Sequence, residues 1–119
     1  MRFGDPTECY RAIGALLAGA ITEPWKETVV DVKLVASAQS VELINWYVPK
    51  ADDTARKHLP YVPGLGRCFY DLAPLLSTED KGYYKRCVFT LWPDGRYDAQ
   101  FVYENASQEG AGVHRRILI

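Results

Sequence analysis

Hydrophobic and polar residues alternate most regularly between residues 84 and 104, on both sides of the segment Pro93-Asp94-Gly95. An apolar residue at every second position is typical of antiparallel strands with one buried face. Pro93 fixes the φ angle of the first turn position, Asp94 suits the second, and Gly95 supplies the positive φ that closes the loop. The pattern therefore predicts a β-hairpin with strands over residues 84–92 and 96–104.

The two faces of this predicted hairpin differ in chemistry. One face is apolar and aromatic, with Cys87, Phe89, Leu91, Tyr97, Ala99, Phe101 and Tyr103. The other face is mixed, with Arg86, Val88, Thr90, Trp92, Arg96, Asp98, Gln100, Val102 and Glu104. A chain of this size needs the first face for its core. We therefore expect recognition to use the second face.

Two segments have the period of an α-helix. Asp5-Pro6-Thr7-Glu8 combines an N-cap, a proline at the first helical position and an acid placed for a capping box. Pro24 cannot continue that helix, whose apolar stripe is Tyr10, Ile13, Leu16, Leu17 and Ala20. A second helix is predicted over residues 66–78, where Pro74 must kink or split it, from the spacing of Leu65, Phe69, Leu72 and Leu76.

Two more strands are predicted before the second helix. Residues 28–36 alternate, with Val30, Val32 and Leu34 on one face and Val29, Asp31 and Lys33 on the other. Residues 40–48 form the next strand, antiparallel to the first across a short turn. Both of its faces are partly apolar, so the period alone does not decide which is buried. If Leu43 faces the core, Ile44 and Trp46 lie beside Val88 and Trp92.

These elements indicate an α+β fold in a single domain over residues 1–119. Its mainly antiparallel, four-stranded sheet comprises residues 28–36, 40–48, 84–92 and 96–104, and the two helices pack on one face of it. Residues 49–66 contain three prolines and two glycines and are expected to form a long loop. Residues 113–119 form either a last short strand or an apolar tail.

Composition narrows the class of protein. The 119 residues are 48% hydrophobic and 24% charged, an ordinary profile for a globular domain. A net charge of -1 argues against direct nucleic-acid binding, which needs clustered basic residues. The longest apolar run, residues 12–21, is too short to cross a bilayer and lacks the flanks of a signal peptide. We therefore expect a cytoplasmic protein with no membrane partner.

The residues that could carry chemistry are few. Three cysteines without metal spacing, Cys9, Cys68 and Cys87, fit buried thiols in a reducing compartment, a Cys68–Cys87 disulfide being the alternative. His58 and His114 have no acid or second histidine at ligand spacing, so no metal site and no cofactor are expected. Pro63-Gly64-Leu65-Gly66 lacks the lysine and hydroxyl residue of a phosphate-binding loop.

A family resemblance is carried by residues 91–104, Leu-Trp-Pro-Asp-Gly-Arg-Tyr-Asp-Ala-Gln-Phe-Val-Tyr-Glu, and by Glu23-Pro24-Trp25 before a valine-rich strand. These motifs resemble those of the YezG-like immunity proteins, small antitoxins of bacterial polymorphic toxin systems. The order of elements agrees over about residues 8 to 104. The resemblance implies a non-enzymatic protein that binds a cognate toxin domain and occludes its active site.

Many toxins of such systems are nucleases, and a nuclease domain is the expected partner. Its basic cleft would attract acidic groups by electrostatic complementarity, and tryptophans ringed by polar groups are typical anchors of protein interfaces. The candidate partner-binding residues are Asp31, Glu42, Trp46, Trp92, Asp94, Arg96, Asp98 and Glu104.

Three alternatives stay open at this point. The tryptophans belong to the core if the C-terminal segment or the 49–66 loop covers that sheet face. The chain is a small-molecule-binding or catalytic domain if a pocket forms between this loop and the sheet, around His58, Tyr61 and Cys68. A self-associating module would use the edge of the hairpin, and the sequence does not decide whether the protein is a homodimer.

Overall fold

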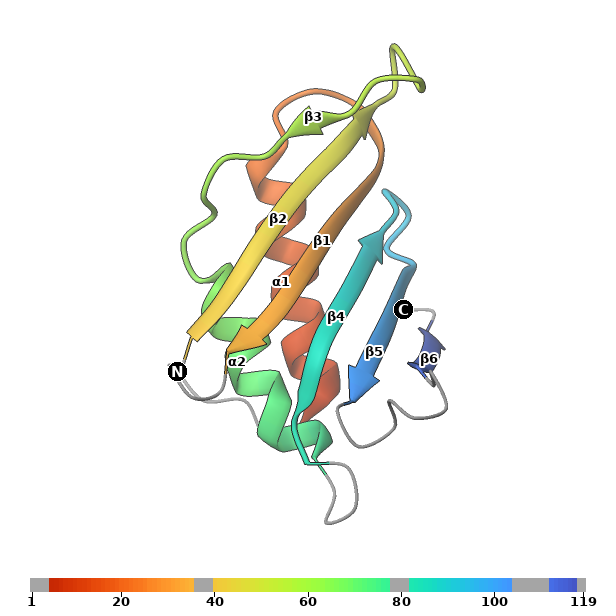
Figure 1. The fold of residues 1–119 in the computed structure, drawn as a ribbon. Helices are drawn as coiled ribbons and strands as arrows, with labels where there is room; N and C mark the ends of the chain where they lie inside the picture. Colours follow the sequence, from red (N-terminus) through yellow and green to blue (C-terminus); the bar gives the residue numbers. More distant parts are fainter. Residues whose placement is uncertain (1–4, 36–39, 78–81, 104–111, 118–119) are drawn as a thin grey trace.

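The computed structural model describes residues 5–35, 40–77, 82–103 and 112–117. Within these ranges the chain forms two helices and one antiparallel sheet (Figure 1). In chain order the elements are α1 (Pro6–Ala20), β1 (Trp25–Val35), β2 (Ser40–Pro49), β3 (Lys57–His58), α2 (Leu65–Leu76), β4 (Tyr84–Leu91), β5 (Tyr97–Tyr103) and β6 (Gly112–Ile117). The α+β architecture predicted from the sequence is confirmed.

The sheet has the order β3-β2-β1-β4-β5-β6, so the prediction of four strands was too small. The four predicted strands form its centre. Two short strands extend it at the edges: β3 pairs with Trp46 and Tyr47 of β2, and β6 pairs with residues 97–102 of β5. Of the two possibilities expected for residues 113–119, a last short strand or an apolar tail, the structure has the strand. Alternation does not identify β3, because it has only two residues.

Both helices lie behind the sheet in Figure 1, on the same face. The central strands contribute alternate residues to the core beneath them, as the period predicts: Val30, Val32, Leu34, Cys87, Phe89, Leu91, Tyr97, Ala99, Phe101 and Tyr103. Leu43 of β2 packs against this core, and its neighbour Ile44 is 60% exposed. The question that period alone left open for β2 is therefore answered.

The predicted hairpin turn is confirmed in detail. Gly95 has φ +95°, and its N–H donates to the carbonyl of Trp92 at 3.0 Å. The N–H of Trp92 donates to the carbonyl of Arg96 at 3.0 Å, which closes a three-residue loop. This is the arrangement in which a turn is followed by a glycine in the left-handed region.

Local sequence also sets the helix ends. The N–H of Glu8 donates to the Asp5 carboxylate at 3.1 Å, which confirms the predicted cap of α1. Pro74 lies inside α2 and the element is continuous, so of the two expected effects, a kink or a split, the split does not occur. Pro74 lacks the N–H that would bond to the carbonyl four residues earlier. It falls in the last turn, so only two helical residues follow it. The Ser77 hydroxyl donates to the Pro74 carbonyl at 2.9 Å just after the helix.

The backbone of the hairpin turn gives a test of stability. Gly95→Ala should lower the free energy of unfolding by about 1 kcal/mol, because alanine is strained at a positive φ even though no atom lies within 4 Å of the added Cβ. Chemical denaturation measures the change.

Gly19→Ala is the matched control, since Gly19 lies in α1 and its added Cβ also meets no atom within 4 Å. This variant should raise stability by about 0.5–1 kcal/mol through helix propensity. Equal effects of the two substitutions would contradict the assigned conformations.

Candidate protein-binding face

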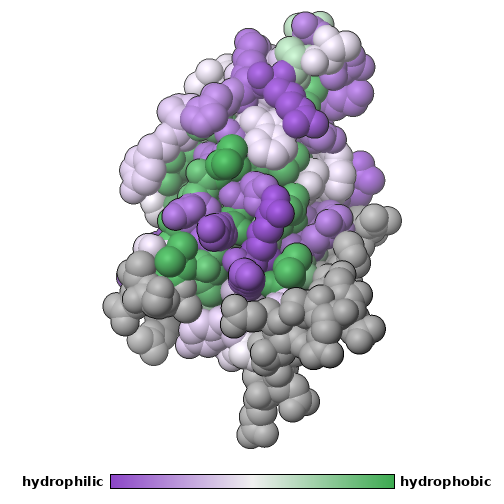
Figure 2. Space-filling view, viewed as in Figure 1, coloured by the Kyte–Doolittle hydropathy of each residue, from purple (hydrophilic) through white to green (hydrophobic). Residues whose placement is uncertain are grey.

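The sheet has one face that neither helix covers, named here the open face. The strand residues that point to it alternate with the core residues, and they are Asp31, Lys33, Glu42, Ile44, Trp46, Arg86, Val88, Thr90, Asp98, Gln100 and Val102. Figure 2 views this face and shows hydrophobic and hydrophilic residues interspersed over the strands. Ile44 and Val102 are exposed there, at 60% and 41% of their surface.

Of the two segments that could have covered the tryptophans, the described C-terminal residues lie elsewhere, and the 49–66 loop reaches Trp46 through Arg56. Residues 112–117 extend the sheet as β6. In the segment between β2 and α2, Leu59 and Val62 are buried in the core on the helix side. Trp46 is half-buried, and it remains on the open face.

Trp46 is partly covered by one side chain from the following loop. The Arg56 guanidinium carbon lies 5.3 Å from the centre of the Trp46 ring, at cation–π distance. The short strand β3 begins at the next residue and pairs His58 with Trp46 and Lys57 with Tyr47. The loop thus returns to the sheet beside Trp46 and brings Arg56 over its ring.

Trp92 lies at the end of the sheet, immediately after β4. The Arg96 guanidinium carbon is 5.2 Å from the centre of its ring, and Arg96 Nε also donates to Asp94 at 2.8 Å. Trp92 also lines a groove of about 170 Å³ between α1 and the hairpin turn, which Trp25 and Pro93 help to line. The predicted residues Trp92, Asp94 and Arg96 therefore form one cluster at the turn.

Asp31 lies in the middle of the open face and forms a bidentate ion pair with Arg86. Arg86 Nε donates to one carboxylate oxygen at 2.9 Å and Nη2 donates to the other at 2.6 Å. The hydrogen bond from Arg86 to Asp31 raises the pKa of the guanidinium above its ordinary value. Asp31 is therefore paired within the chain, which leaves its carboxylate less available to a basic partner.

The remaining predicted acids differ from one another. Asp98 is buried and accepts a hydrogen bond from Gln100 at 3.2 Å. Glu42 is exposed in the first half of β2 and forms no ion pair within the described ranges, although Lys33 lies opposite on β1. Glu104 lies outside the described residues.

The residues of the alternative pocket do not come together as a reactive group. His58 and Tyr61 are exposed, Tyr61 at 83%, whereas Cys68 is buried in the core. Burial raises the pKa of the Cys68 thiol, which disfavours the thiolate that a nucleophile needs. Cys9 and Cys87 are also free, buried thiols, so the expectation of small buried hydrophobes is confirmed and the Cys68–Cys87 bridge is absent.

A charged network that sequence reasoning missed holds β3 in place. Lys57 Nζ donates to the Glu23 carboxylate at 2.8 Å, and the Tyr47 hydroxyl donates to the same oxygen at 2.5 Å. These hydrogen bonds, that of Lys57 first, hold the pKa of the Glu23 carboxyl below its ordinary value. Lys57 is 34 positions from Glu23, so no local spacing could have indicated the contact.

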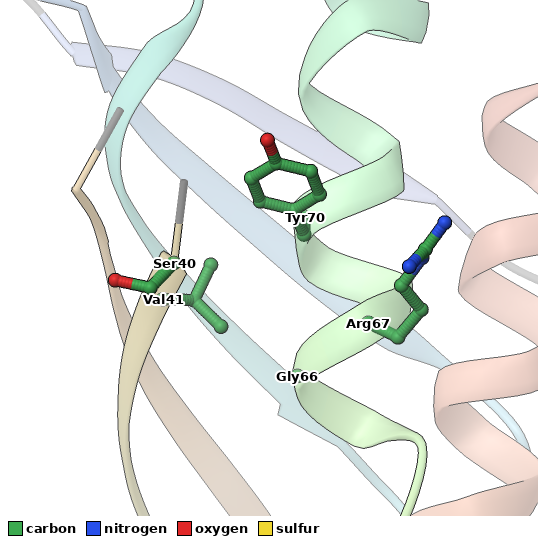
Figure 3. Close-up of a pocket in the computed structure, with 5 residues that line it drawn as sticks. All are labelled: Ser40, Val41, Gly66, Arg67 and Tyr70. Carbon is green, nitrogen blue, oxygen red and sulfur yellow. The ribbon is translucent and has the colours of Figure 1, made fainter. Parts of the chain in front are cut away.

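A larger groove lies where α2 crosses the start of β2 (Figure 3). Its volume is about 390 Å³, and its lining residues are Ser40, Val41, Gly66, Arg67 and Tyr70. Val41 points toward Gly66 in Figure 3, and a Cβ at Gly66 would lie 3.2 Å from a Val41 methyl carbon. The helix approaches the strand this closely because residue 66 has no side chain.

Within 5–35, 40–77, 82–103 and 112–117, no three side chains of His, Cys, Asp or Glu are grouped so that they could hold a metal ion. No helix in the described ranges has the length and apolar character to span a membrane.

Comparison with known proteins assigns no family to the chain. No protein-family model matches it, and no curated protein matches its sequence.

The Glu23 network predicts a pH effect on β3. Because the pKa of Glu23 in the folded state lies below its ordinary value of 4.5, the stabilising contribution of this carboxylate is present above pH 4.5 and is lost as the pH falls through the folded-state pKa. Protection of the Lys57 amide from hydrogen exchange should therefore fall on acidification below 4.5.

Glu23→Gln should abolish this acid-dependent loss of amide protection. Glu27→Gln, which changes the third residue of β1, should retain it. A loss that persists in the Glu23 variant would show that another group anchors β3.

Proposed function

We propose that this chain is an immunity protein of the YezG-like kind, which binds a toxin domain in the cytoplasm of the producing cell and blocks it without chemistry of its own. The observation that carries the proposal is the uncovered sheet face. Both helices pack on one side, and the other side keeps exposed Ile44 and half-buried Trp46. Exposed apolar residues that gather into a contiguous patch commonly mark an interface.

The two tryptophans are suited to anchor a partner. Trp46 and Trp92 each have an arginine stacked at a little over 5 Å, so each ring is held before binding. A side chain that is already ordered loses less conformational entropy when a complex forms. Aromatic residues with polar neighbours are the usual centres of binding energy in protein interfaces.

The size of the open face is adequate for part of a specific interface. The five longer strands, about 4.8 Å apart, span about 19 Å, and the seven residues of β5 extend about 23 Å. Their product, about 440 Å² before side-chain relief, is about half of the roughly 800 Å² per partner of a standard interface. A partner seated here would need a further contribution from the rim, such as the hairpin turn.

Charge on the face favours a partner with basic groups only in part. Asp31 and Asp94 are paired with arginines, and Glu42 keeps its charge unpaired within the described ranges. A nuclease domain, which binds phosphates through basic residues, is the proposed partner class, with Glu42 as the acid most available to it. Inhibition then follows from covering the substrate cleft.

Tests by substitution follow from the anchor residues. Trp46→Ala and Trp92→Ala should each weaken the complex by about 2 kcal/mol or more, roughly thirtyfold in Kd, because each removes a large apolar contact. The measurement is growth rescue and co-purification on co-expression with the product of the gene immediately upstream, followed by titration calorimetry.

Ile44→Lys guards against misfolding, since the position is exposed and the lysine lies opposite Asp31, so stability should change by no more than about 0.5 kcal/mol while the complex gains a buried charge. Tyr61→Ala is the control and should leave rescue intact, because Tyr61 is exposed in the loop away from the open face. Loss of rescue in the Tyr61 variant, with rescue retained in the tryptophan and Ile44 variants, would favour the alternative pocket.

A further inference from the structure

The outer edge of β2 is paired over only part of its length. Figure 1 shows β3 beside one end of β2, and the pairs are confined to Trp46 and Tyr47. A further hydrogen bond runs from the Leu59 N–H to the Asn45 carbonyl at 2.9 Å. Between Ser40 and Ile44, no described strand pairs with this edge.

The direction of the free backbone groups follows from that hydrogen bond. The Asn45 carbonyl points away from β1, and backbone groups of residues two apart in a strand point the same way. The N–H and C=O groups of Val41 and Leu43 therefore point outward at this edge. Together they offer two donors and two acceptors in register for an added strand.

The groove of Figure 3 begins at the same place. Val41 and Leu43 direct their side chains to the helix side, and Val41 lines the groove with Gly66 and Tyr70 of α2. In an antiparallel pair, residues opposite Val41 and Leu43 would point to this same side. A groove of about 390 Å³ beside the edge can accept an apolar side chain from an added strand.

The edge is unsuited to a second copy of the same chain. Two β2 edges related by a twofold axis at residue 42 would pair Val41 with Leu43 of the other copy, and would set the two Glu42 carboxylates directly opposite each other. Like charges at opposite positions destabilise a pair of strands. Edge charges of this kind commonly prevent self-association.

The Glu42 carboxylate favours a basic residue in any strand that pairs with the β2 edge. Glu42 is exposed between Val41 and Leu43, on the open-face side, and it forms no ion pair in the described part of the chain. A lysine or arginine opposite Glu42 would form a favourable cross-strand pair.

We propose that the Ser40–Ile44 edge of β2 binds an extended segment of a partner protein, in which a lysine or arginine faces Glu42 and apolar residues on each side of it face Val41 and Leu43. The added strand receives main-chain hydrogen bonds from the edge, and its side chains are selected by the groove and by Glu42. That the segment belongs to a toxin domain rests on the proposed function. The edge itself is a separate site from the tryptophan anchors.

The test uses the full chain, labelled with ¹⁵N, and three capped pentapeptides at millimolar concentration. The first is Thr-Val-Lys-Val-Thr, the second has glutamate in place of lysine, and the third has N-methyl groups on both valines. The lysine peptide should shift the Val41 and Leu43 amide signals and bind about threefold more tightly than the glutamate peptide. The N-methylated peptide should leave these signals unchanged, because it lacks the required donors.

Charge reversal tests the register. Glu42→Lys should reverse the preference between the first two peptides, and Asp53→Lys, at an exposed acid in the loop after β2, should not change it. Absence of amide shifts at Val41 and Leu43, or equal binding of all three peptides, would overturn the proposal.

The outcomes separate this proposal from the proposed function. Growth rescue by the wild type together with no peptide response would remove the strand addition and leave the immunity function. If the peptide preference reverses in Glu42→Lys but the wild type does not rescue growth from the upstream toxin, the binding site at the β2 edge stands and the toxin is rejected as its partner.

Discussion

The arrangement of the whole domain depends on the contacts of Phe89, at the centre of β4. Its ring lies 6.2 Å from Tyr10 of α1, 6.0 Å from Phe69 of α2 and 5.5 Å from Tyr97 of β5, between ring centres. One side chain thus joins both helices to the central strands. Tyr84 adds a buried hydrogen bond from its hydroxyl to the Phe69 carbonyl at 2.5 Å. Since both helices are held to the same face, the opposite face is left without a helix.

That constraint explains the composition of the open face. A sheet face without a helical cover is exposed to water, and here the Asp31–Arg86 ion pair lies beside Ile44 and Val88. The arginines stacked on Trp46 and Trp92 reduce the apolar surface offered to water and still leave it available to a partner. The first half of the outer β2 edge is also without a paired strand in the described residues.

The sequence predicted those features that depend on residues close to one another along the chain. The turn at Gly95, the cap at Asp5 and the buried alternation of Cys87, Phe89 and Leu91 depend on neighbouring residues, and the structure has them as expected. The parts that sequence reasoning missed depend on distant pairing: β3 at the sheet edge, the place of β6 beside β5, Arg56 over Trp46, and Glu23 with Lys57. Because β6 occupies the outer side of β5, the hairpin edge that a self-associating module would use is already paired. At the other side of the sheet, the Ser40–Ile44 part of β2 is unpaired within the described residues.

The central claim is that a partner protein binds the open face and the adjoining Trp92 cluster at the hairpin turn. Hydroxyl-radical footprinting of the complex with the purified upstream gene product, compared with the free chain, tests it most directly. The account predicts that Ile44, Trp46 and Trp92 become protected, while exposed Tyr61 and Tyr83 react as before. Protection of Tyr61 or Tyr83, with unchanged reactivity at Ile44, Trp46 and Trp92, would contradict it.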